Sequence, residues 1–239
     1  MKKIGIIIVA GTDHIRQKYM LEHLSRSTTH PFCQAYISIM MPEHISKAAI
    51  YLYNGCKVLP TYTRSISGRY NELIDKAKKD SCTHICIVPF SFMLSKGWLQ
   101  ELSDQHQKTS GAGIFGIIND GIVANYIPVM QDDNSLPEPR MIHLLQNDLN
   151  SVVGVQYFSV SSLDFVGYFD DKADLSAYEQ AEFCFRFSAN GYTNCYIRKH
   201  HAIVYQWVDH AIFPIQTKER EMQLIGEIQR MSKCKNFKK

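Results

Sequence analysis

The segment Ile4–Val9 constrains the fold more strongly than any other part of the sequence. It reads Ile-Gly-Ile-Ile-Ile-Val, an apolar run rich in β-branched side chains. A strand with one solvated face alternates apolar and polar residues, whereas an uninterrupted apolar run is typical of a strand buried on both faces of a parallel sheet. Parallel strands are joined by crossover connections, which are usually helices. The chain is therefore predicted to have an α/β fold.

Strand and helix patterns alternate after this run. The first helix begins after Thr12 or Asp13 and is expected to turn Tyr19, Leu21 and Leu24 toward the core. Such alternation predicts a mainly parallel central sheet flanked by helices, with ligands bound at the carboxyl ends of the strands. Further strands are expected at 35–40, 56–59, 84–88 and 113–118, and helices at 42–53, 67–80 (capped by Ser67) and 95–107.

The alternation stops near residue 118. Residues 119–150 are polar and rich in turn formers, and we expect a lid or an acceptor-side excursion. Within them, Gln131-Asp132-Asp133-Asn134 suits either a cation site or a solvated turn. Beyond them we expect an extended segment at 152–160, a short helix capped by Ser161, a helix capped by Ser176, strands at 192–198 and 202–205, and an amphipathic helix at 216–232.

The bulk composition fits one soluble globular domain. The 239 residues are 45% hydrophobic and 21% charged, which is enough for one sizeable core. We assign residues 1–215 to an α/β domain and residues 216–239 to a C-terminal helix and basic tail. A net charge of +3 gives no basis for nucleic-acid binding. The tail fits either a solvated end or weak contact with an anionic membrane surface through Lys233, Lys235, Lys238 and Lys239.

The cysteines and apolar runs predict a cytoplasmic, soluble protein. The seven cysteines are odd in number and scattered, and they lack zinc-ligand spacing, so we expect reduced thiols in a reducing compartment. The start of the chain resembles a signal peptide superficially, but its apolar run is short and no convincing cleavage site follows. No segment approaches the roughly 20 apolar residues that span a bilayer.

A later stretch combines a turn with an acidic helix. The turn is Phe165-Val166-Gly167-Tyr168-Phe169-Asp170, and the predicted helix carries Glu179 in its first turn and ends near Asn190-Gly191. Glu179 stands where a capping box places its acidic residue. A carboxylate at a helix start can also act as a general base toward a sugar hydroxyl.

This stretch resembles the acceptor side of the family-2 glycosyltransferases, which read Gly-Gly-Phe-Asp, then Glu-Asp-x-Asp-x-x-x-Arg, then Gly-Tyr. Other pieces in the family's order are Gly68-Arg69-Tyr70-Asn71, Lys96-Gly97-Trp98-Leu99 and the strand that starts at Gly111. The resemblance implies the glycosyltransferase A-type fold, also called the nucleotide-diphospho-sugar transferase fold. It also implies transfer of a sugar, with inversion, from a nucleotide-sugar donor to a glycan or other hydroxyl acceptor.

The same resemblance implies the positions of the site residues. Glu179 or Glu182 is the expected catalytic carboxylate, and Trp98 and Asp170 are expected on the acceptor side. For Glu182 the alternative is a helix ion pair with Arg186, whereas capping and catalysis can coexist at Glu179. The residues expected to line the nucleotide-sugar pocket are Ala10, Gly11, Thr12, Gly68, Asn71, Pro89 and Ser91.

Three motif positions depart from the family pattern. The metal-binding Asp-x-Asp falls at Pro89-Phe90-Ser91, which offers no carboxylate, so no metal is expected there, and nothing in the sequence supports Mg or Mn. Gln180 replaces the expected aspartate base, and the late histidine falls at Tyr205 or Gln206.

Two hypotheses follow from these departures. One is a transferase that stabilises the leaving diphosphate without a metal, through Arg64, Arg69 or Lys96, and that uses Glu179 or Glu182 as its base. The other is a catalytically inactive binding or structural protein that retains the fold, because a fold does not determine a function.

Overall fold

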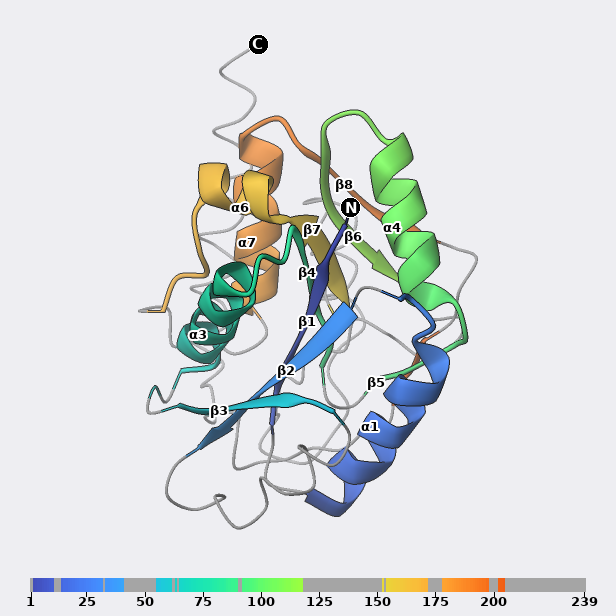
Figure 1. The fold of residues 1–239 in the computed structure, drawn as a ribbon. Coiled ribbons are helices and arrows are strands. Elements are labelled where there is room, and N and C mark those ends of the chain that lie inside the picture. The colour runs from blue at the N-terminus through green and yellow to red at the C-terminus, as the bar shows by residue number, and fades with distance from the viewer. Residues whose placement is uncertain are drawn as a thin grey trace, which may run out of the picture.

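A seven-stranded, mostly parallel sheet forms the centre of the protein in this computed structural model (Figure 1). The structure describes residues 2–10, 14–31, 33–40, 55–61, 63, 65–89, 92–117, 152, 154–171, 178–197 and 202–204. The strand order across the sheet is β3-β2-β1-β4-β7-β6-β8. These strands are β1 (Ile4–Val9), β2 (Cys33–Met40), β3 (Lys57–Thr61), β4 (His84–Ile87), β6 (Ala112–Ile117), β7 (Gln156–Ser159) and β8 (Thr193–Ile197).

The first four strands run in one direction. Strand β1 pairs in parallel with β2 and β4, and β2 pairs in parallel with β3. Strand β7 is antiparallel to both of its neighbours, whereas β6 and β8 are parallel. A separate antiparallel pair consists of β5 (Phe92–Leu94) and β9 (Ala202–Val204). The side of the sheet where β1 to β4 end is called the carboxyl edge below, and the side where they begin is called the amino edge.

Helices cover both faces of the sheet. In Figure 1, α1 and α4 lie on one side of it, and α3, α6 and α7 lie on the other. This arrangement gives three layers with the sheet in the middle, as the sequence pattern predicts. The described helices are α1 (His14–Ser27), α3 (Ile66–Lys79), α4 (Trp98–Lys108), α6 (Val160–Val166) and α7 (Tyr178–Ala189).

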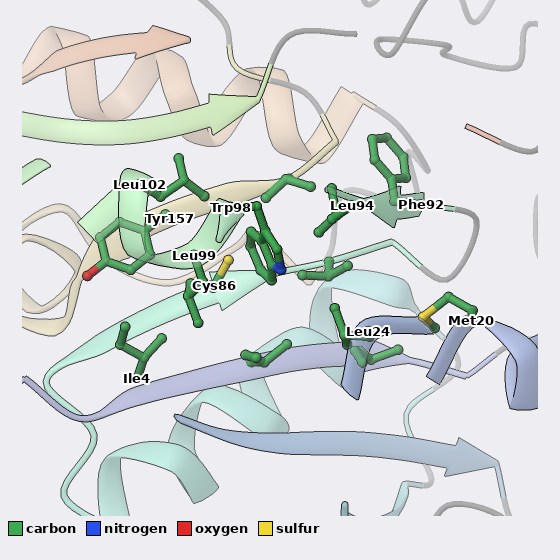
Figure 2. Packing of buried hydrophobic residues seen from close by; sticks show 14 of the residues in the cluster. Ile4, Met20, Leu24, Cys86, Phe92, Leu94, Trp98, Leu99, Leu102 and Tyr157 are labelled. Atoms are coloured by element: carbon green, nitrogen blue, oxygen red, sulfur yellow. The ribbon is translucent and has the colours of Figure 1, made fainter. Parts of the chain in front are cut away.

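Strand β1 supplies side chains to two hydrophobic cores, one on each face. Ile6 and Ile8 belong to the core under α1 and α4, which contains the fully buried Trp98 (Figure 2). Ile7 belongs to the core under α3, α6 and α7, together with Phe183. All six residues of β1 are buried, which confirms the interpretation of this run. Each fully buried large aliphatic side chain contributes roughly 1.5–3 kcal/mol of transfer free energy.

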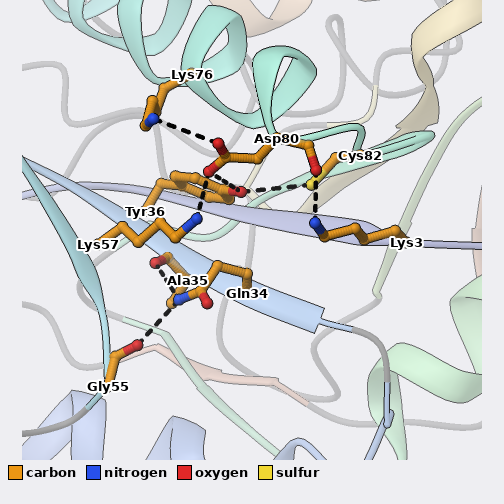
Figure 3. A network of polar contacts seen from close by, with 9 residues as sticks. All are labelled: Lys3, Gln34, Ala35, Tyr36, Gly55, Lys57, Lys76, Asp80 and Cys82. Atoms are coloured by element: carbon orange, nitrogen blue, oxygen red, sulfur yellow. Dashed lines mark hydrogen bonds and ion pairs between the residues drawn. The ribbon is translucent and has the colours of Figure 1, made fainter.

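A network of ion pairs and hydrogen bonds lies at the amino edge (Figure 3). Asp80, the C-cap of α3, pairs with Lys57 and Lys76, and it accepts a hydrogen bond of 3.0 Å from the Tyr36 hydroxyl. The hydrogen bond from Lys57 is the main reason that the pKa of Asp80 falls to about 2. Lys3 also donates to the Asp80 carbonyl. These contacts join the end of α3 to the first three strands.

Two helix caps differ from the sequence prediction. Helix α3 is capped by Ser65, whose Oγ accepts a 3.0 Å hydrogen bond from the Gly68 N–H, and Ser67 is buried inside the first turn. Helix α6 is capped by Ser159 rather than Ser161. In both cases an earlier serine has the extended backbone that a capping residue needs, so the helix starts sooner than predicted.

Tyr19 was predicted to point into the core, and this is wrong. Its exposed fraction is 66%, whereas Met20, Leu21 and Leu24 of the same helix are buried. Adjacent helical residues lie about 100° apart, so burial of Met20 and Leu21 turns Tyr19 toward solvent.

Strand β5 (Phe92–Leu94) was not predicted from the sequence. The remaining described elements match their predicted positions to within a few residues. The predicted helices at 42–53 and 216–232, the excursion at 119–150, the Ser176 cap and the lysine tail lie outside the described residues. The domain assignment of 1–215 and 216–239 therefore stays a prediction. Within the described ranges, no helix is long and apolar enough to cross a bilayer.

Candidate functional site

The carboxyl ends of β1 and β4 lie side by side. The Val88 N–H donates to the Ile7 carbonyl at 3.0 Å, so the two strands stay paired to the end of β4. Ala10 follows β1, and its N–H donates to the Ser38 carbonyl of β2 at 3.0 Å. Ala10 and Pro89 therefore lie at the same edge of the sheet, as the prediction requires. The predicted pocket residues Gly11, Thr12 and Ser91 lie outside the described residues.

A buried arginine joins the strand ends at this edge. Arg69, in the first turn of α3, is only 2% exposed. Its Nε donates to the Ser38 Oγ at 2.7 Å, and its Nη2 donates to the Ala10 carbonyl at 3.0 Å. The Ser38 hydroxyl also bonds to the Thr61 hydroxyl of β3 at 2.9 Å. The guanidinium thus brings a positive charge to the carboxyl ends of β1 and β2.

Gly68 allows the first turn of α3 to pack closely against the preceding loop. A Cβ atom at this position would lie 2.2 Å from the Thr63 Cγ2 and 2.8 Å from the Ser65 Oγ. Such distances exclude any larger residue without a shift of the loop. The glycine predicted to belong to the nucleotide pocket therefore has a packing role that the sequence did not reveal.

Asn71 bonds to the turn that precedes α7 in the chain. Its Nδ2 donates to the Phe169 carbonyl at 2.9 Å, and its Oδ1 accepts from the Phe169 N–H at 3.2 Å. From α7, the Arg186 Nη2 donates to the Tyr168 carbonyl at 2.8 Å. Both side chains hold the backbone just before Asp170, which is exposed. The structure thus brings together the first turns of α3 and the Gly167–Asp170 segment.

Glu179 begins α7 beside the same part of α3. Its exposed fraction is 6%. Burial raises the pKa of Tyr70, and the negative charge of Glu179 raises it further. Tyr70 follows Arg69 in the sequence and contacts Phe169, with ring centroids 5.5 Å apart. Phe169 also stacks on Phe183, one turn after Glu179 in α7, with ring centroids 4.0 Å apart, so the start of α7 lies beside both predicted halves of the site.

Gln180, at the position predicted for the catalytic base, has its side chain bonded to the backbone. It is 8% exposed, and its amide bonds to both polar groups of a single residue, Gly154. The Gly154 N–H donates to the Gln180 Oε1 at 2.7 Å, and the Gln180 Nε2 donates to the Gly154 carbonyl at 3.2 Å.

Glu182 forms an ion pair with Arg186 one turn later in α7. The Arg186 Nε and Nη2 donate to the two carboxylate oxygens at 2.6 Å and 3.0 Å. This two-point pair is the helix-pair alternative that the sequence left open for Glu182. Glu179 is therefore the better candidate for a base.

Trp98 lies in the core between the sheet and α1 (Figure 2). Its ring is fully buried, and its Nε1 donates to the Thr28 Oγ1 at 3.1 Å. In this structure the ring has no exposed surface through which to contact an acceptor. The short Gly97-Trp98 motif instead starts α4, where Gly97 has a φ of +84°.

The described residues contain no cluster of three or more histidine, cysteine or acidic side chains that could hold a metal ion. At the position where the sequence resemblance predicts the first metal-binding aspartate, Pro89 has no side-chain donor atom. The described residues at this position do not fit a divalent ion, since such ions prefer carboxylate and carbonyl oxygens.

Sequence reasoning missed the polar residues beneath the site. Ser38 lies within β2 and Thr61 ends β3, where a single hydroxyl gives no local signal. Ser38 bonds to Thr61, 23 residues away, and to Arg69, 31 residues away. The contact between Gln180 and Gly154 was also missed. The only local signal for it was a glycine inside the apolar segment at 152–155, which has a φ of +96°.

Solved structures with a similar fold include two that hold a nucleotide sugar and one cytidylyltransferase. S. aureus TarS 1-349 in complex with UDP-GlcNAc matches with a TM-score of 0.66 at 12% identity, over 96% of this chain and 66% of that one. The mannosyltransferase PcManGT from Pyrobaculum calidifontis, in complex with GDP-Man and Mn2+, matches with a TM-score of 0.60 at 10% identity, over 98% and 73%. A cytidylyltransferase from Leptospira borgpetersenii matches with a TM-score of 0.53 at 12% identity, over 96% and 95%.

These likenesses show that the chain has the glycosyltransferase A-type fold, with helices on both faces of a mainly parallel sheet. The chain spans between 43% and 66% of the length of the TarS chains that it resembles. No protein-family profile matches the sequence, and no curated protein matches it.

Proposed function

We propose that this protein transfers a sugar from a nucleotide-diphospho-sugar donor to a glycan or other hydroxyl acceptor. The observation that carries the proposal is the convergence at one place of three parts of an A-type fold. These parts are the first turns of α3 with Arg69, the Gly167–Asp170 segment, and the start of α7 with Glu179.

The donor is proposed to bind at the carboxyl edge of the sheet. The general tendency of parallel sheets to bind ligands there supports this position. Ala10 and Pro89 end adjacent strands, and the charge of Arg69 lies beneath them. We assign the nucleotide pocket to these residues together with Gly11, Thr12, Gly68, Asn71 and Ser91 from the family resemblance.

The proposed reaction is a single displacement with inversion. The acceptor oxygen forms a bond to the anomeric carbon while its proton passes to Glu179. The bond between that carbon and the diphosphate oxygen breaks, and the electron pair leaves with the nucleoside diphosphate. Arg69, with Arg64 or Lys96, is proposed to stabilise the negative charge that develops on the diphosphate. Asp170 is exposed and follows the backbone that Asn71 and Arg186 hold, and we propose that it contacts the acceptor.

The family-2 assignment belongs to this proposal too. It is supported by the order of the motifs in the sequence and by the position of the Gly167–Asp170 segment directly before α7. No step is routed through a metal ion, because Pro89 replaces a metal-binding aspartate.

The alternative is a protein that binds a nucleotide sugar without transferring it. Two observations favour it: the proline in the metal-binding motif, and the engagement of Gln180 with backbone where the family has its base. The two candidates differ in turnover but not in donor binding.

The test is a calorimetric titration of the full chain with the diphosphates of uridine, guanosine, cytidine and thymidine, with and without manganese. We expect one of them to bind at micromolar to millimolar concentration, and we expect manganese to change the affinity little. Release of nucleoside diphosphate from UDP-GlcNAc and GDP-mannose then separates the candidates. Binding with release supports the transferase, and binding without release to either water or a panel of hydroxyl acceptors supports the binding protein. No binding of any diphosphate rejects both and supports a structural protein that retains the fold.

A further inference from the structure

The contact between Gln180 and Gly154 is a two-point pairing in which a side-chain amide binds one residue's N–H and carbonyl. We call it the Gln180 clamp. Its hydrogen bonds measure 2.7 Å and 3.2 Å, and both residues are buried. Gly154 has a φ of +96°, a conformation that favours glycine and turns both of its polar groups toward α7. Buried backbone groups need partners, so the clamp satisfies a requirement of this turn.

Two further side chains extend the clamp into a buried polar seam between α7 and the segment at 152–156. The Gln156 Nε2 donates to the Val152 carbonyl at 2.7 Å and to the Gln180 carbonyl at 3.3 Å. The Cys184 thiol donates to the Val152 carbonyl at 3.1 Å and accepts from the Val152 N–H at 3.2 Å. The seam therefore fixes the first two turns of α7 to the segment that leads into β7.

Near neutral pH, an amide has the hydrogen-bonding capacity that the clamp uses, whereas an ionised carboxylate does not. The amide oxygen accepts from the N–H while the amide nitrogen donates to the carbonyl. An ionised carboxylate at the same place could accept from the N–H but would face the Gly154 carbonyl oxygen with a second acceptor and a buried charge. The aspartate that the family has at position 180 would thus be unfavourable in this seam.

We infer that Gln180 is a positioning residue, which holds the first turn of α7, and with it Glu179, against the segment at 152–156. The glutamine is then an adaptation of this fold rather than the remnant of a lost base. The part of the inference that concerns Glu179 rests on the proposed function. The hydrogen-bonding role of Gln180 does not rest on it. An experiment can therefore reject the role of Glu179 without rejecting the clamp, or the reverse.

The decisive variant is Gln180→Glu, because a glutamic acid has the pairing capacity of the amide only when it is protonated. Near neutral pH the carboxylate lacks the donor, whereas in acid the neutral carboxyl both accepts and donates. The ionisable groups nearby are Glu179, Glu182 and the Cys184 thiol on α7, and the segment at 152–156 contains no ionisable residue. Burial of position 180 and the adjacent Glu179 favour the neutral form of the new acid, whereas the charge of Glu182 is paired with that of Arg186 on the same helix.

We expect the thermal midpoint of Gln180→Glu to lie roughly 4–10 °C below that of the wild type near pH 8, the size expected for a buried unsatisfied pairing in a chain of this length. This difference from the wild type should shrink by at least about half near pH 5. Gln34→Glu is the matched control, because the Gln34 amide also donates to two carbonyls, those of Ala35 and Gly55, but at the surface (Figure 3). A Gln180→Glu deficit equal to that of the control, or one that is the same at both pH values, would overturn the clamp.

A second variant, Gln180→Asp, restores the family's residue and distinguishes positioning from a lost base. We expect a lower thermal midpoint than the wild type and no gain in nucleoside diphosphate release. A faster release than the wild type would overturn the inference, since it would show that position 180 can reach the acceptor. If neither protein releases diphosphate, the proposed function loses support, while the pH-dependent result for Gln180→Glu still decides the clamp.

Discussion

The two edges of the central sheet use their polar residues differently. At the amino edge, ionisable side chains contact one another: Asp80 pairs with Lys57 and Lys76, and His84 packs against His106 with ring centroids 5.5 Å apart. At the carboxyl edge, the described contacts of Arg69 are with carbonyl and hydroxyl oxygens of strands that end there.

This difference separates an edge that is held by ion pairs from an edge where a cation lies among the strand ends. At the amino edge, Asp80 pairs with two lysines, and these charges hold the end of α3 to the strands. The Arg69 guanidinium places a positive charge at the carboxyl ends of β1 and β2, which is where parallel sheets bind their ligands. A positive charge at this position favours a bound diphosphate, so the carboxyl edge is the better candidate for the site.

The largest effect is expected from Glu179→Gln. If Glu179 is the base, turnover should fall by roughly 10²–10⁴ with donor affinity nearly unchanged. Glu101→Gln is the control, since Glu101 occupies the first turn of α4 as Glu179 occupies that of α7. Urea unfolding of both variants corrects for any loss of helix capping. Equal turnover in Glu179→Gln and the wild type would remove Glu179 from the mechanism.

The next effect concerns Arg69→Met. The substitution removes the buried hydrogen bonds that Arg69 donates to the Ala10 carbonyl and to the Ser38 hydroxyl, so the free energy of unfolding should fall by roughly 2–4 kcal/mol in urea titrations. Arg26→Met, at an exposed position of α1, should change it by less than about 0.5 kcal/mol. If both variants lose the same unfolding free energy, the buried Arg69 does not stabilise the carboxyl edge.

A smaller effect is expected from acid at the amino edge. Burial lowers the pKa of His106 to about 4, with a further contribution from Lys2, and burial likewise lowers the pKa of His84 to about 4. The fold therefore favours neutral histidines, and the stability they contribute is complete above a pH of about 6.5 and is lost as the pH falls toward 4.

His106→Leu should make the protein less sensitive to this acidification. Between about pH 7 and pH 5, the wild type should lose about 1–2 kcal/mol more unfolding free energy than the variant does. Urea titrations of both proteins at several pH values measure the difference. Parallel losses in the two proteins would show that His106 does not cause the acid sensitivity.

The smallest effect is expected from Lys57→Met. Lys57 is 44% exposed, and its pair with Asp80 lies at the surface, so solvent screens it. The free energy of unfolding should fall by about 0.5 kcal/mol, and the difference should diminish in high salt. A loss that is several times larger and independent of salt would mean that the amino edge is held more tightly than its exposure suggests.

The fold could be predicted largely because its strands carry local signals. The apolar run Ile4–Val9 indicates a strand buried on both faces, and its side chains contribute to both cores. Other features depend on contacts between distant residues. No local pattern in the sequence indicates that β7 runs antiparallel to β4. Ser65 and Ser67 are close together, so the sequence alone does not show which of them caps α3.

The candidate site was less predictable than the fold, for the same reason. The sequence indicated Glu179 by its place at a helix start, which is a local signal. The four-residue spacing of Glu182 and Arg186 also indicated their ion pair, which the structure has. The sequence did not reveal that Trp98 faces α1. Gly154, the partner of Gln180, lies 26 residues away in the chain, and no short-range sequence pattern predicts a contact over that separation.

Hydrogen exchange with and without a nucleoside diphosphate tests most directly the claim that the carboxyl edge binds the donor. The full chain would be measured with the diphosphate that binds best in the titrations. We predict slower exchange in the peptides that contain Ala10, Arg69 and Pro89, and unchanged exchange in those that contain His84 and His106. Protection confined to the amino-edge peptides, or no protection at a saturating concentration, would contradict the account.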